Sequence, residues 1–413
     1  MGKDYDFDYI VIGSGPAGRT IAVELAKAKK TVAVIEADAL GGAELNTRDL
    51  PFKINLDFAH TYHKFANSPA VNRNSCHFNF PTLITTIDKN IATAQDRIAA
   101  KFKTLGIKTI FGFAHFLDPR TIIVNEDKYT AKYFILATGS KLKATEISGL
   151  DTVNFLTPDT VFRTRRLPRF VFVAGGGPTG VEIAEYFASL GTGVIIMERG
   201  DHLLPHEDDE VAEIVTTRLK NLGVSIVTGS RVTAIAEDYN SKIVVFMNGA
   251  SEKMVRVDAI VLATGSEPFL DYSLENAGVD YKKSGIIADK YFNTTAKNIF
   301  AIGDCLGNIN SSTDRAILEA HTLANNLLHH QKSTPKYSNI ARLINTHPSI
   351  AVLGHNERDA VSRDLSYKKA IYPLDENGSF VKILTDNKNR FLGASIVAEN
   401  ADLALRIKNL LTN

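Results

Sequence analysis

The stretch Asp8-Tyr9-Ile10-Val11-Ile12-Gly13-Ser14-Gly15-Pro16-Ala17-Gly18 decides the fold of this chain. Apolar residues lead into Gly13 and a helical pattern follows Gly18, which predicts a strand, a tight turn and a helix. Gly13 permits the turn, Gly15 lets backbone approach a pyrophosphate, and Gly18 lets the helix pack closely on the strand. The free N–H groups at the start of the helix favour phosphate. The stretch therefore predicts a dinucleotide-binding unit.

The whole pattern occurs a second time. Another apolar run, residues 170–174, leads into Gly175-Gly176-Gly177-Pro178-Thr179-Gly180. In each copy a further apolar strand ends in an acid, and the spacing from third glycine to acid is 18 both times: Gly18 to Glu36, and Gly180 to Glu198. An acid there can hydrogen-bond a ribose hydroxyl. Each copy also closes on an apolar strand and a small-residue turn, Ala137-Thr138-Gly139 and Ala263-Thr264-Gly265. Two complete units predict two bound dinucleotides.

Composition narrows the class of protein. The chain has 413 residues, 44% hydrophobic and 23% charged, which predicts two to three domains of an ordinary globular protein. A net charge of +1 gives no electrostatic case for nucleic acid or an anionic membrane. The two cysteines, Cys76 and Cys305, exclude a disulfide framework and fit a reducing cytoplasm. The N-terminus lacks the layout of a signal peptide, and no apolar run reaches the ~18 residues of a membrane span.

The remaining segments complete an α/β pattern. Residues 54–105 favour helices, the strongest over 84–105, and short strands follow over 107–136. A strand at 298–302 ends in Gly303-Asp304, and a helix is predicted from about Asp314 to Leu328. From about Pro335 the pattern favours antiparallel strands and one last helix, predicted at 350–353, 369–372, 380–384, 391–397 and 401–411.

In combination these motifs resemble the pyridine nucleotide-disulfide oxidoreductases, flavoproteins with two dinucleotide-binding domains that include glutathione reductase and dihydrolipoamide dehydrogenase. The resemblance covers nearly the whole chain. It implies an α/β fold with two Rossmann-like domains, for FAD and NAD(P)H, and a shortened α+β interface domain that forms a homodimer. The implied boundaries are 1–147 with 267–333 for FAD, 148–266 for NAD(P)H, and 334–413 for the interface.

The resemblance also implies the site residues. For FAD they are Gly13, Gly15, Pro16, Ala17, Gly18, Glu36, Gly42, Lys53, Ala137, Thr138, Gly139, Gly303 and Asp304. For NAD(P)H they are Gly175, Gly177, Gly180, Glu182, Glu198, Arg199, Ala263, Thr264 and Gly265. Glu198 favours NADH because a carboxylate would repel a 2′-phosphate, whereas the neighbouring Arg199 leaves NADPH open. Lys53 and Glu182 match the family's pair near flavin N5, where a cation stabilises charge as hydride arrives; for Lys53 the alternative is a solvated surface lysine.

Two departures from the family carry the functional prediction. Glu44 and Asp49 stand where the family has its two redox cysteines, and neither Cys76 nor Cys305 lies in that segment. A carboxylate cannot form a disulfide or take electrons by thiolate exchange. The family's C-terminal His-Pro…Glu segment, which acts as acid–base catalyst in the partner subunit's site, is also expected to be missing.

The sequence therefore predicts an FAD-dependent oxidoreductase. It takes hydride from NADH or NADPH and passes electrons to a small molecule other than a disulfide: a quinone, oxygen, a metal ion or another nucleotide. The alternative is a non-catalytic FAD- and NAD(P)H-binding sensor or partner subunit. No metal site is expected, because the stretch with His202, His206, Glu207 and Asp208 lacks metal-ligand spacing and reads as a solvated helix start. Cys305 is expected to pack rather than to react.

Overall fold

The fold is that of a computed structural model, which describes residues 5–72, 76–143, 145–164, 166–307, 312–376, 378–399, 403, 406 and 407. The chain divides into two compact units. The first comprises Met1–Pro51, Thr86–Lys143 and Ser266–Lys336, and the second comprises Phe52–Thr85, Ala144–Gly265 and Tyr337–Asn413. The three-domain division inferred from the sequence stays a prediction.

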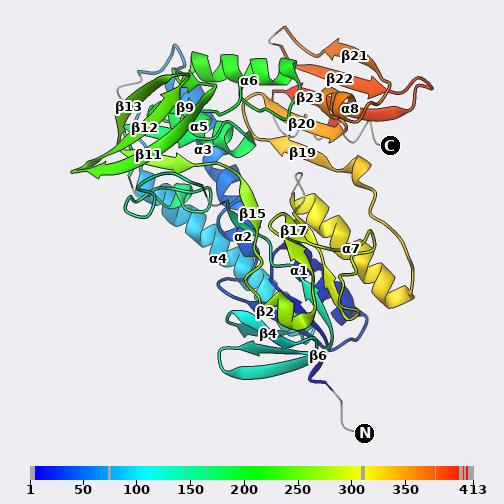
Figure 1. The fold of residues 1–413 in the computed structure, drawn as a ribbon. Coiled ribbons are helices and arrows are strands. Elements are labelled where there is room, and N and C mark those ends of the chain that lie inside the picture. The colour runs from blue at the N-terminus through cyan, green and yellow to red at the C-terminus, as the bar shows by residue number, and fades with distance from the viewer. Residues whose placement is uncertain are drawn as a thin grey trace. The chain divides into compact units, whose positions relative to one another are not determined.

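The first unit is built on a seven-stranded sheet in the order β3-β2-β1-β6-β5-β4, with β18 beside β6. Figure 1 labels β2, β4 and β6 of this sheet. Its strands are β1 (Phe7–Ile12), β2 (Val32–Glu36), β3 (Lys108–Phe111), β4 (Ala114–Asp118), β5 (Thr121–Val124), β6 (Asp127–Leu136) and β18 (Ile299–Ala301). β1, β2, β3, β6 and β18 run parallel, with Ile12 paired to both Ile35 and Leu136. The carboxyl ends of these strands meet at one edge, which is where open parallel sheets bind ligands.

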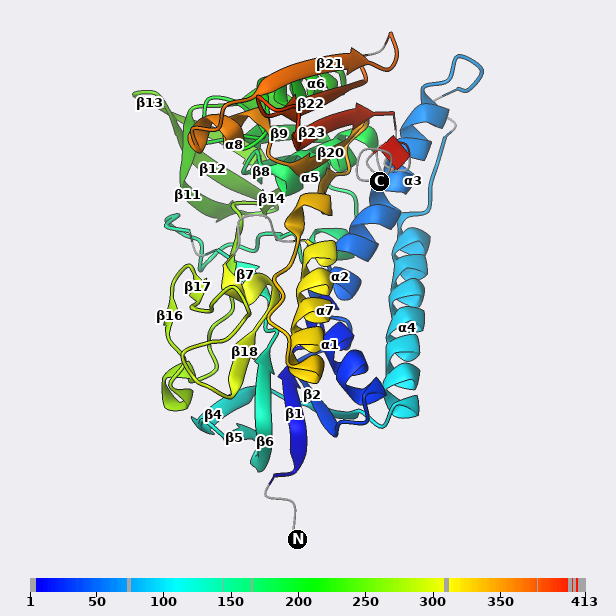
Figure 2. The ribbon, with the colours of Figure 1, turned by 90° about the vertical axis from the view of Figure 1, so that its right-hand side faces the viewer.

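Helices α1 (Pro16–Lys27) and α7 (Thr313–His329) lie side by side against this sheet (Figure 2). Ile21, Leu25 and Leu323 share one buried core cluster with β1. The unit also holds α2 (Gly42–Asn46), β7 (Ser140–Leu142), β15 (Ser266–Pro268), β16 (Tyr281–Lys282) and β17 (Gly285–Ile286). α3 (Asp49–Ala66) and α4 (Phe80–Thr104) have residues in both units.

The second unit repeats the first architecture on a smaller scale. Its parallel sheet has the order β10-β9-β8-β14, with β8 (Phe170–Ala174), β9 (Gly193–Met197), β10 (Ser225–Val227) and β14 (Ala259–Leu262). α5 (Pro178–Ser189) and α6 (Asp209–Asn221) belong to the same unit, as does an antiparallel sheet of β11 (Ser230–Asp238), β12 (Ser241–Asn248) and β13 (Ser251–Val257). α5 begins at Pro178 because proline suits the first helical position.

The C-terminal part of the second unit is a five-stranded antiparallel sheet, in the order β19-β20-β23-β22-β21. Its elements are β19 (Ala341–Ile344), β20 (Ser349–Gly354), α8 (Glu357–Ser362), β21 (Lys368–Pro373), β22 (Phe380–Thr385) and β23 (Phe391–Ala398). The sequence predicted four of these strands and missed β19. The helix predicted over 401–411 falls mostly outside the described residues.

The described residues contain no helix that is both long enough and apolar enough to cross a membrane. The predicted fold class, an α/β protein with two Rossmann-like sheets and a further α+β part, is confirmed.

Candidate functional site: two dinucleotide loops and a carboxylate segment

The first glycine loop is shaped by contacts that exclude side chains. Gly13 has φ +101°, a conformation that favours glycine. A Cβ on Gly18 would lie 2.0 Å from the Gly13 carbonyl oxygen, so only glycine allows α1 to approach β1 this closely. At Gly15 the nearest atom to an added Cβ is Gly42 Cα at 4.0 Å. Gly15 caps α1 without a side-chain hydrogen bond, which leaves the helix N–H groups for a phosphate.

The second loop has the same geometry. Gly175 has φ +115°, and a Cβ on Gly180 would lie 1.9 Å from the Gly175 carbonyl oxygen. An added Cβ on Gly177 meets nothing within 4 Å, and Gly177 caps α5 without a side-chain hydrogen bond. Both loops therefore provide a cradle that a side chain would fill and that fits a pyrophosphate, as FAD and NAD(P)H require.

The two strand-end acids support their own glycine loops. Glu36 accepts hydrogen bonds from Ser14 N at 3.0 Å, Ser14 Oγ at 2.5 Å and Asp38 N at 3.0 Å. Glu198 accepts from Gly176 N at 2.7 Å and Gly200 N at 2.8 Å. In each case one donor is the residue after the first glycine of the loop, and the other lies two residues after the acid. The predicted contact of these acids with ribose stays a prediction, and Arg199 beside Glu198 is exposed.

The small-residue turns that close each unit lie against the glycine loops. Ala137 N donates to the carbonyl of Ile12 at 2.9 Å, and Ala263 N donates to that of Ala174 at 2.8 Å. Thr138 Oγ1 donates to the carbonyl of Phe269 at 2.9 Å. The glycines that end these turns, Gly139 and Gly265, have φ +72° and +96°. Glycine at these two positions adopts the positive φ without strain and adds no side chain to the turn.

A buried acid that the sequence reading missed holds the Gly303-Asp304 turn. Glu319 of α7 is fully buried and accepts from Gly303 N at 2.7 Å and Arg315 Nε at 2.9 Å. Ser140 Oγ donates to Asp304 Oδ2 at 3.2 Å. The sequence offered one sign of this role: Glu319 lies on the apolar face of the predicted helix. A carboxylate buried among apolar neighbours needs a hydrogen-bonding partner close to it.

Glu44 and Asp49, the two carboxylates that the sequence analysis matched to the family's redox cysteines, have separate partners. Arg19 donates to Glu44 at 2.7 Å and to the carbonyl of Gly41 at 3.2 Å. Thr313 Oγ1 donates to Asp49 Oδ2 at 2.5 Å. The crowding of Asp49 by protein raises the pKa of its carboxyl, and the hydrogen bond from Thr313 offsets part of that rise. The carboxyl nevertheless reaches solvent.

Lys53 and Glu182, both in the second unit, have different surroundings. Lys53 is exposed on α3, whereas Glu182 on α5 is buried. Glu182 accepts from Asn345 N at 2.6 Å and Asn345 Nδ2 at 2.9 Å, a partner that the sequence reading missed. The role of Lys53 and Glu182 at a flavin stays a prediction.

The two cysteines have different surroundings. Cys305 is fully buried, and its Sγ donates to the carbonyls of Leu136 at 3.4 Å and Ile302 at 3.2 Å. Burial raises the pKa of the Cys305 thiol to about 12, which suppresses the thiolate at neutral pH. Cys76 lies in the second unit and contacts the carbonyl of Asn72 at 3.7 Å.

The prediction of a solvated helix start around residues 202–208 is wrong for its acids. α6 does begin at Asp209, but Glu207 and Asp208 are only 3% and 2% exposed. Arg342 donates to both Glu207 oxygens at 3.0 Å. The Nζ of the buried Lys382 lies 3.1 Å from Asp208 Oδ2. The segment faces the C-terminal sheet, which no local pattern could reveal.

Three acidic residues around Lys382 have the composition of a cation site. Oxygens of Asp208, Glu210 and Glu357 lie within 4.8 Å of one another. Lys382 Nζ contacts all three, at 3.1, 3.0 and 2.5 Å. The ammonium group already supplies the positive charge, so a metal ion would have to displace a buried lysine.

Two glycine loops at helix starts, each closed by an acid and a small-residue turn, define a protein that binds two dinucleotides. The sequence model of the family "Pyridine nucleotide-disulphide oxidoreductase" matches residues 7–322, and the chain belongs to this family. Members of the family use FAD and NAD(P)H, so the cofactor prediction is confirmed, as is the predicted family.

Three known proteins illustrate the relationship. The chain is 30% identical over 415 residues to a mercuric reductase of Bacillus cereus, covering 96% of this chain and 65% of that protein's length. It is 27% identical over 438 residues to a dihydrolipoyl dehydrogenase of Bacillus subtilis, covering 98% and 91%. The Cu(II) complex of the HOCl-induced flavoprotein disulfide reductase RclA from Escherichia coli superposes with a TM-score of 0.87 at 25% identity, covering 100% and 93%.

Proposed function

We propose that this protein is an FAD-dependent oxidoreductase that accepts hydride from NADH and delivers electrons to an acceptor other than a disulfide. The observation that carries the proposal is the pair of carboxylates in the segment where relatives hold their redox cysteines. Glu44 is bound to Arg19 and Asp49 to Thr313. Neither group can form a covalent bond to a substrate sulfur.

The remaining cysteines support the same conclusion. Disulfide exchange needs an accessible thiolate, because the thiolate is the attacking species. Cys305 is fully buried with a raised thiol pKa, so it does not meet this requirement. A single, partly buried thiol at Cys76 cannot supply both the exchanging and the resolving cysteine.

The chain's own residues bind and orient the two cofactors. The loop from Gly13 to Gly18 would hold the pyrophosphate of FAD, and the loop from Gly175 to Gly180 that of NADH. Bound FAD supplies the chemistry of hydride acceptance. Glu198 would select NADH, because its carboxylate, fixed by two backbone N–H groups, would repel a 2′-phosphate.

The acceptor belongs to one of four classes: a quinone, oxygen, a metal ion or another nucleotide. The names of two relatives, a mercuric reductase and a flavoprotein studied as a Cu(II) complex, support including metal ions. Asp49, solvent-accessible and near the start of α3, would lie beside the flavin and would disfavour negative charge on the reduced ring when ionised. We also propose a homodimer, formed through the part of the chain from about Pro335.

One experiment tests the enzyme and its acceptor together. Under anaerobic conditions NADH should bleach the bound flavin. NADH oxidation should then be screened with quinones, oxygen, metal ions, a second nicotinamide nucleotide, glutathione disulfide, lipoamide and cystine. The proposal expects turnover with at least one of the first four acceptors and background rates with the disulfides. Robust turnover of a disulfide would refute it. NADH binding without bleaching of the flavin would favour the alternative hypothesis, a non-catalytic sensor, over the enzyme.

A further inference from the structure

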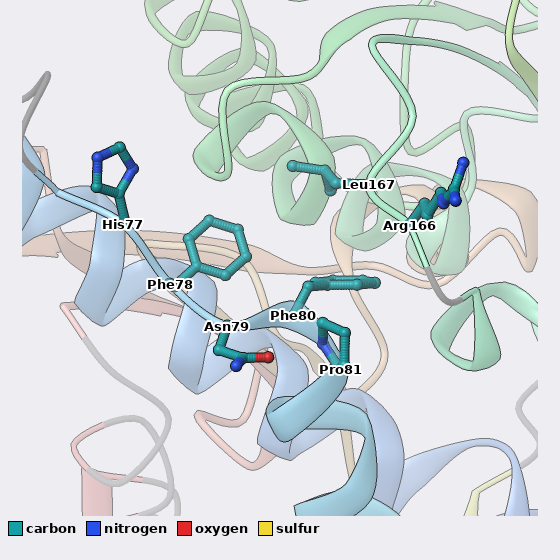
Figure 3. Close-up of a pocket in the computed structure, with 7 residues that line it drawn as sticks. All are labelled: His77, Phe78, Asn79, Phe80, Pro81, Arg166 and Leu167. Carbon is teal, nitrogen blue, oxygen red and sulfur yellow. The ribbon is translucent and has the colours of Figure 1, made fainter.

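A pocket lies in the second unit, away from the glycine loop. A pocket of ≈ 650 Å³, called here the aromatic pocket, is lined by His77, Phe78, Asn79, Phe80, Pro81, Arg166 and Leu167. Figure 3 shows Leu167 reaching toward the ring of Phe78, while the ring of Phe80 extends toward Arg166. The volume is within the range of about 300–1,000 Å³ that is usual for small-molecule sites.

Aromatic side chains of α3 hold the aromatic wall of this pocket in place. Phe58 and Tyr62 of α3 pack edge-on against Phe78, with ring centroids 5.4 and 4.7 Å away. The Phe78 and Phe80 rings lie 6.2 Å apart at 63°. Tyr62 also donates from its hydroxyl to the carbonyl of Cys76 at 3.2 Å, which ties the segment to α3. A ligand ring would therefore meet a wall that is already formed.

The polar lining favours negative charge. None of the seven lining residues is acidic, and two of them, Arg166 and His77, are basic. Within the part of the chain that the structure describes, the Arg166 guanidinium has no hydrogen-bonding or ion-pairing partner. A free guanidinium binds carboxylate or phosphate through two parallel hydrogen bonds. α4 begins at Phe80, so the positive end of its dipole adds to the same field.

The aromatic pocket is distinct from the predicted nucleotide site of the same unit. Arg166 and Leu167 precede the amino end of β8 at Phe170, whereas the glycine loop follows its carboxyl end at Ala174. Five residues of strand separate the two by about 15 Å along the sheet. NADH in its loop would not fill the pocket.

We propose that the aromatic pocket binds a planar aromatic anion, with its ring against Phe78 and Leu167 and its anionic group on Arg166. Aromatic faces alone would accept any flat apolar molecule. The unpaired Arg166 guanidinium at the rim favours a ligand with an anionic group, because the two form charge-assisted hydrogen bonds that an uncharged ligand cannot form. This inference goes beyond the proposed oxidoreductase activity and does not depend on the acceptor.

The test uses FAD-loaded protein and two probes of nearly equal shape, naphthoate and the uncharged naphthylmethanol. Isothermal titration should show saturable naphthoate binding that is weakened about tenfold by Arg166→Gln, the loss of one charge-assisted contact. Naphthylmethanol affinity should be the same in both proteins. Phe78→Ala should weaken both probes. Arg169→Gln is the matched control, because Arg169 is an exposed arginine outside the pocket lining.

Several outcomes would overturn the proposal. One is naphthoate binding that does not saturate or is unaffected by Arg166→Gln. Another is an equal loss in Arg169→Gln, which would indicate a general effect of surface charge. A third is competition by NADH, which would place the probe in the nucleotide loop instead.

Discussion

Replacement of Lys382 by methionine tests whether the buried charge cluster holds the C-terminal sheet to α6 and α8. Lys382 on β22 is 0% exposed, and its Nζ lies within 3.1 Å of Asp208, Glu210 and Glu357. Methionine fills the space of the lysine stem but removes the ammonium group. Among the described residues, the variant would leave Asp208, itself 1% exposed in its side chain, without an ion-pair partner.

The expected loss of stability follows from the carboxylates. Burial alone would raise the pKa of Glu357, but hydrogen bonds from Lys382, Lys369 and Tyr367 outweigh it and lower that pKa from 4.5 to about 2. A shift of this size corresponds to about 3 kcal/mol, shared among the three donors. Removing one partner of a buried pair costs about 3–5 kcal/mol. The free energy of unfolding should therefore fall by about 3–5 kcal/mol, or the Tm by about 6–20 °C.

Thermal and urea unfolding at neutral pH measure the effect, with Lys369→Met as the matched control. Lys369 contacts the same Glu357 at 3.0 Å but is 48% exposed, so its loss should cost less than about 1 kcal/mol. Equal small effects of the two substitutions would refute the reasoning.

The pH dependence gives an independent check. A lowered carboxyl pKa stabilises the fold above the unfolded value, and this contribution is lost as the pH falls from 4.5 toward about 2. Lys382 stays protonated throughout that range. The stability difference between wild type and Lys382→Met should shrink as the pH falls through this range. A difference that stays constant down to pH of about 3 would contradict the ion-pair explanation.

Further predictions concern the cofactor sites. Gly177→Val should abolish NADH binding while FAD is retained, because an added Cβ there meets no protein atom within 4 Å and the side chain would occupy the pyrophosphate cradle. Gly15→Val should instead abolish FAD binding while NADH binding is retained, and the FAD released on heating and NADH titration measure the two effects. Glu198→Ala should reduce the preference for NADH over NADPH in flavin reduction. A preference of the wild-type protein for NADPH would show that Glu198 does not determine the choice of nucleotide. Glu319→Gln should weaken FAD retention by about 1–3 kcal/mol, because the amide cannot accept from both Gly303 N and Arg315; unchanged FAD affinity would remove its positioning role.

The glycine loops, their acids and the helices after them could be predicted from sequence because their physics is local. A loop that needs Gly13 at φ +101° and a Cβ-free Gly18 specifies its own geometry within a few residues. The repeat at a fixed spacing, and the alternating strands near the C-terminus, are equally local patterns.

Tertiary structure alone decided the environments of the charged groups. Glu207 and Asp208 look like an exposed helix start, but Arg342 of β19 and Lys382 of β22 bury them from more than 130 positions along the chain. Glu182 meets Asn345 by the same kind of distant contact, 163 positions away, whereas Glu319 meets Gly303 across 16 positions, from a helix to the turn before it. Burial and charge pairing depend on which segments meet in space, and a one-dimensional pattern contains no information on a partner that distant.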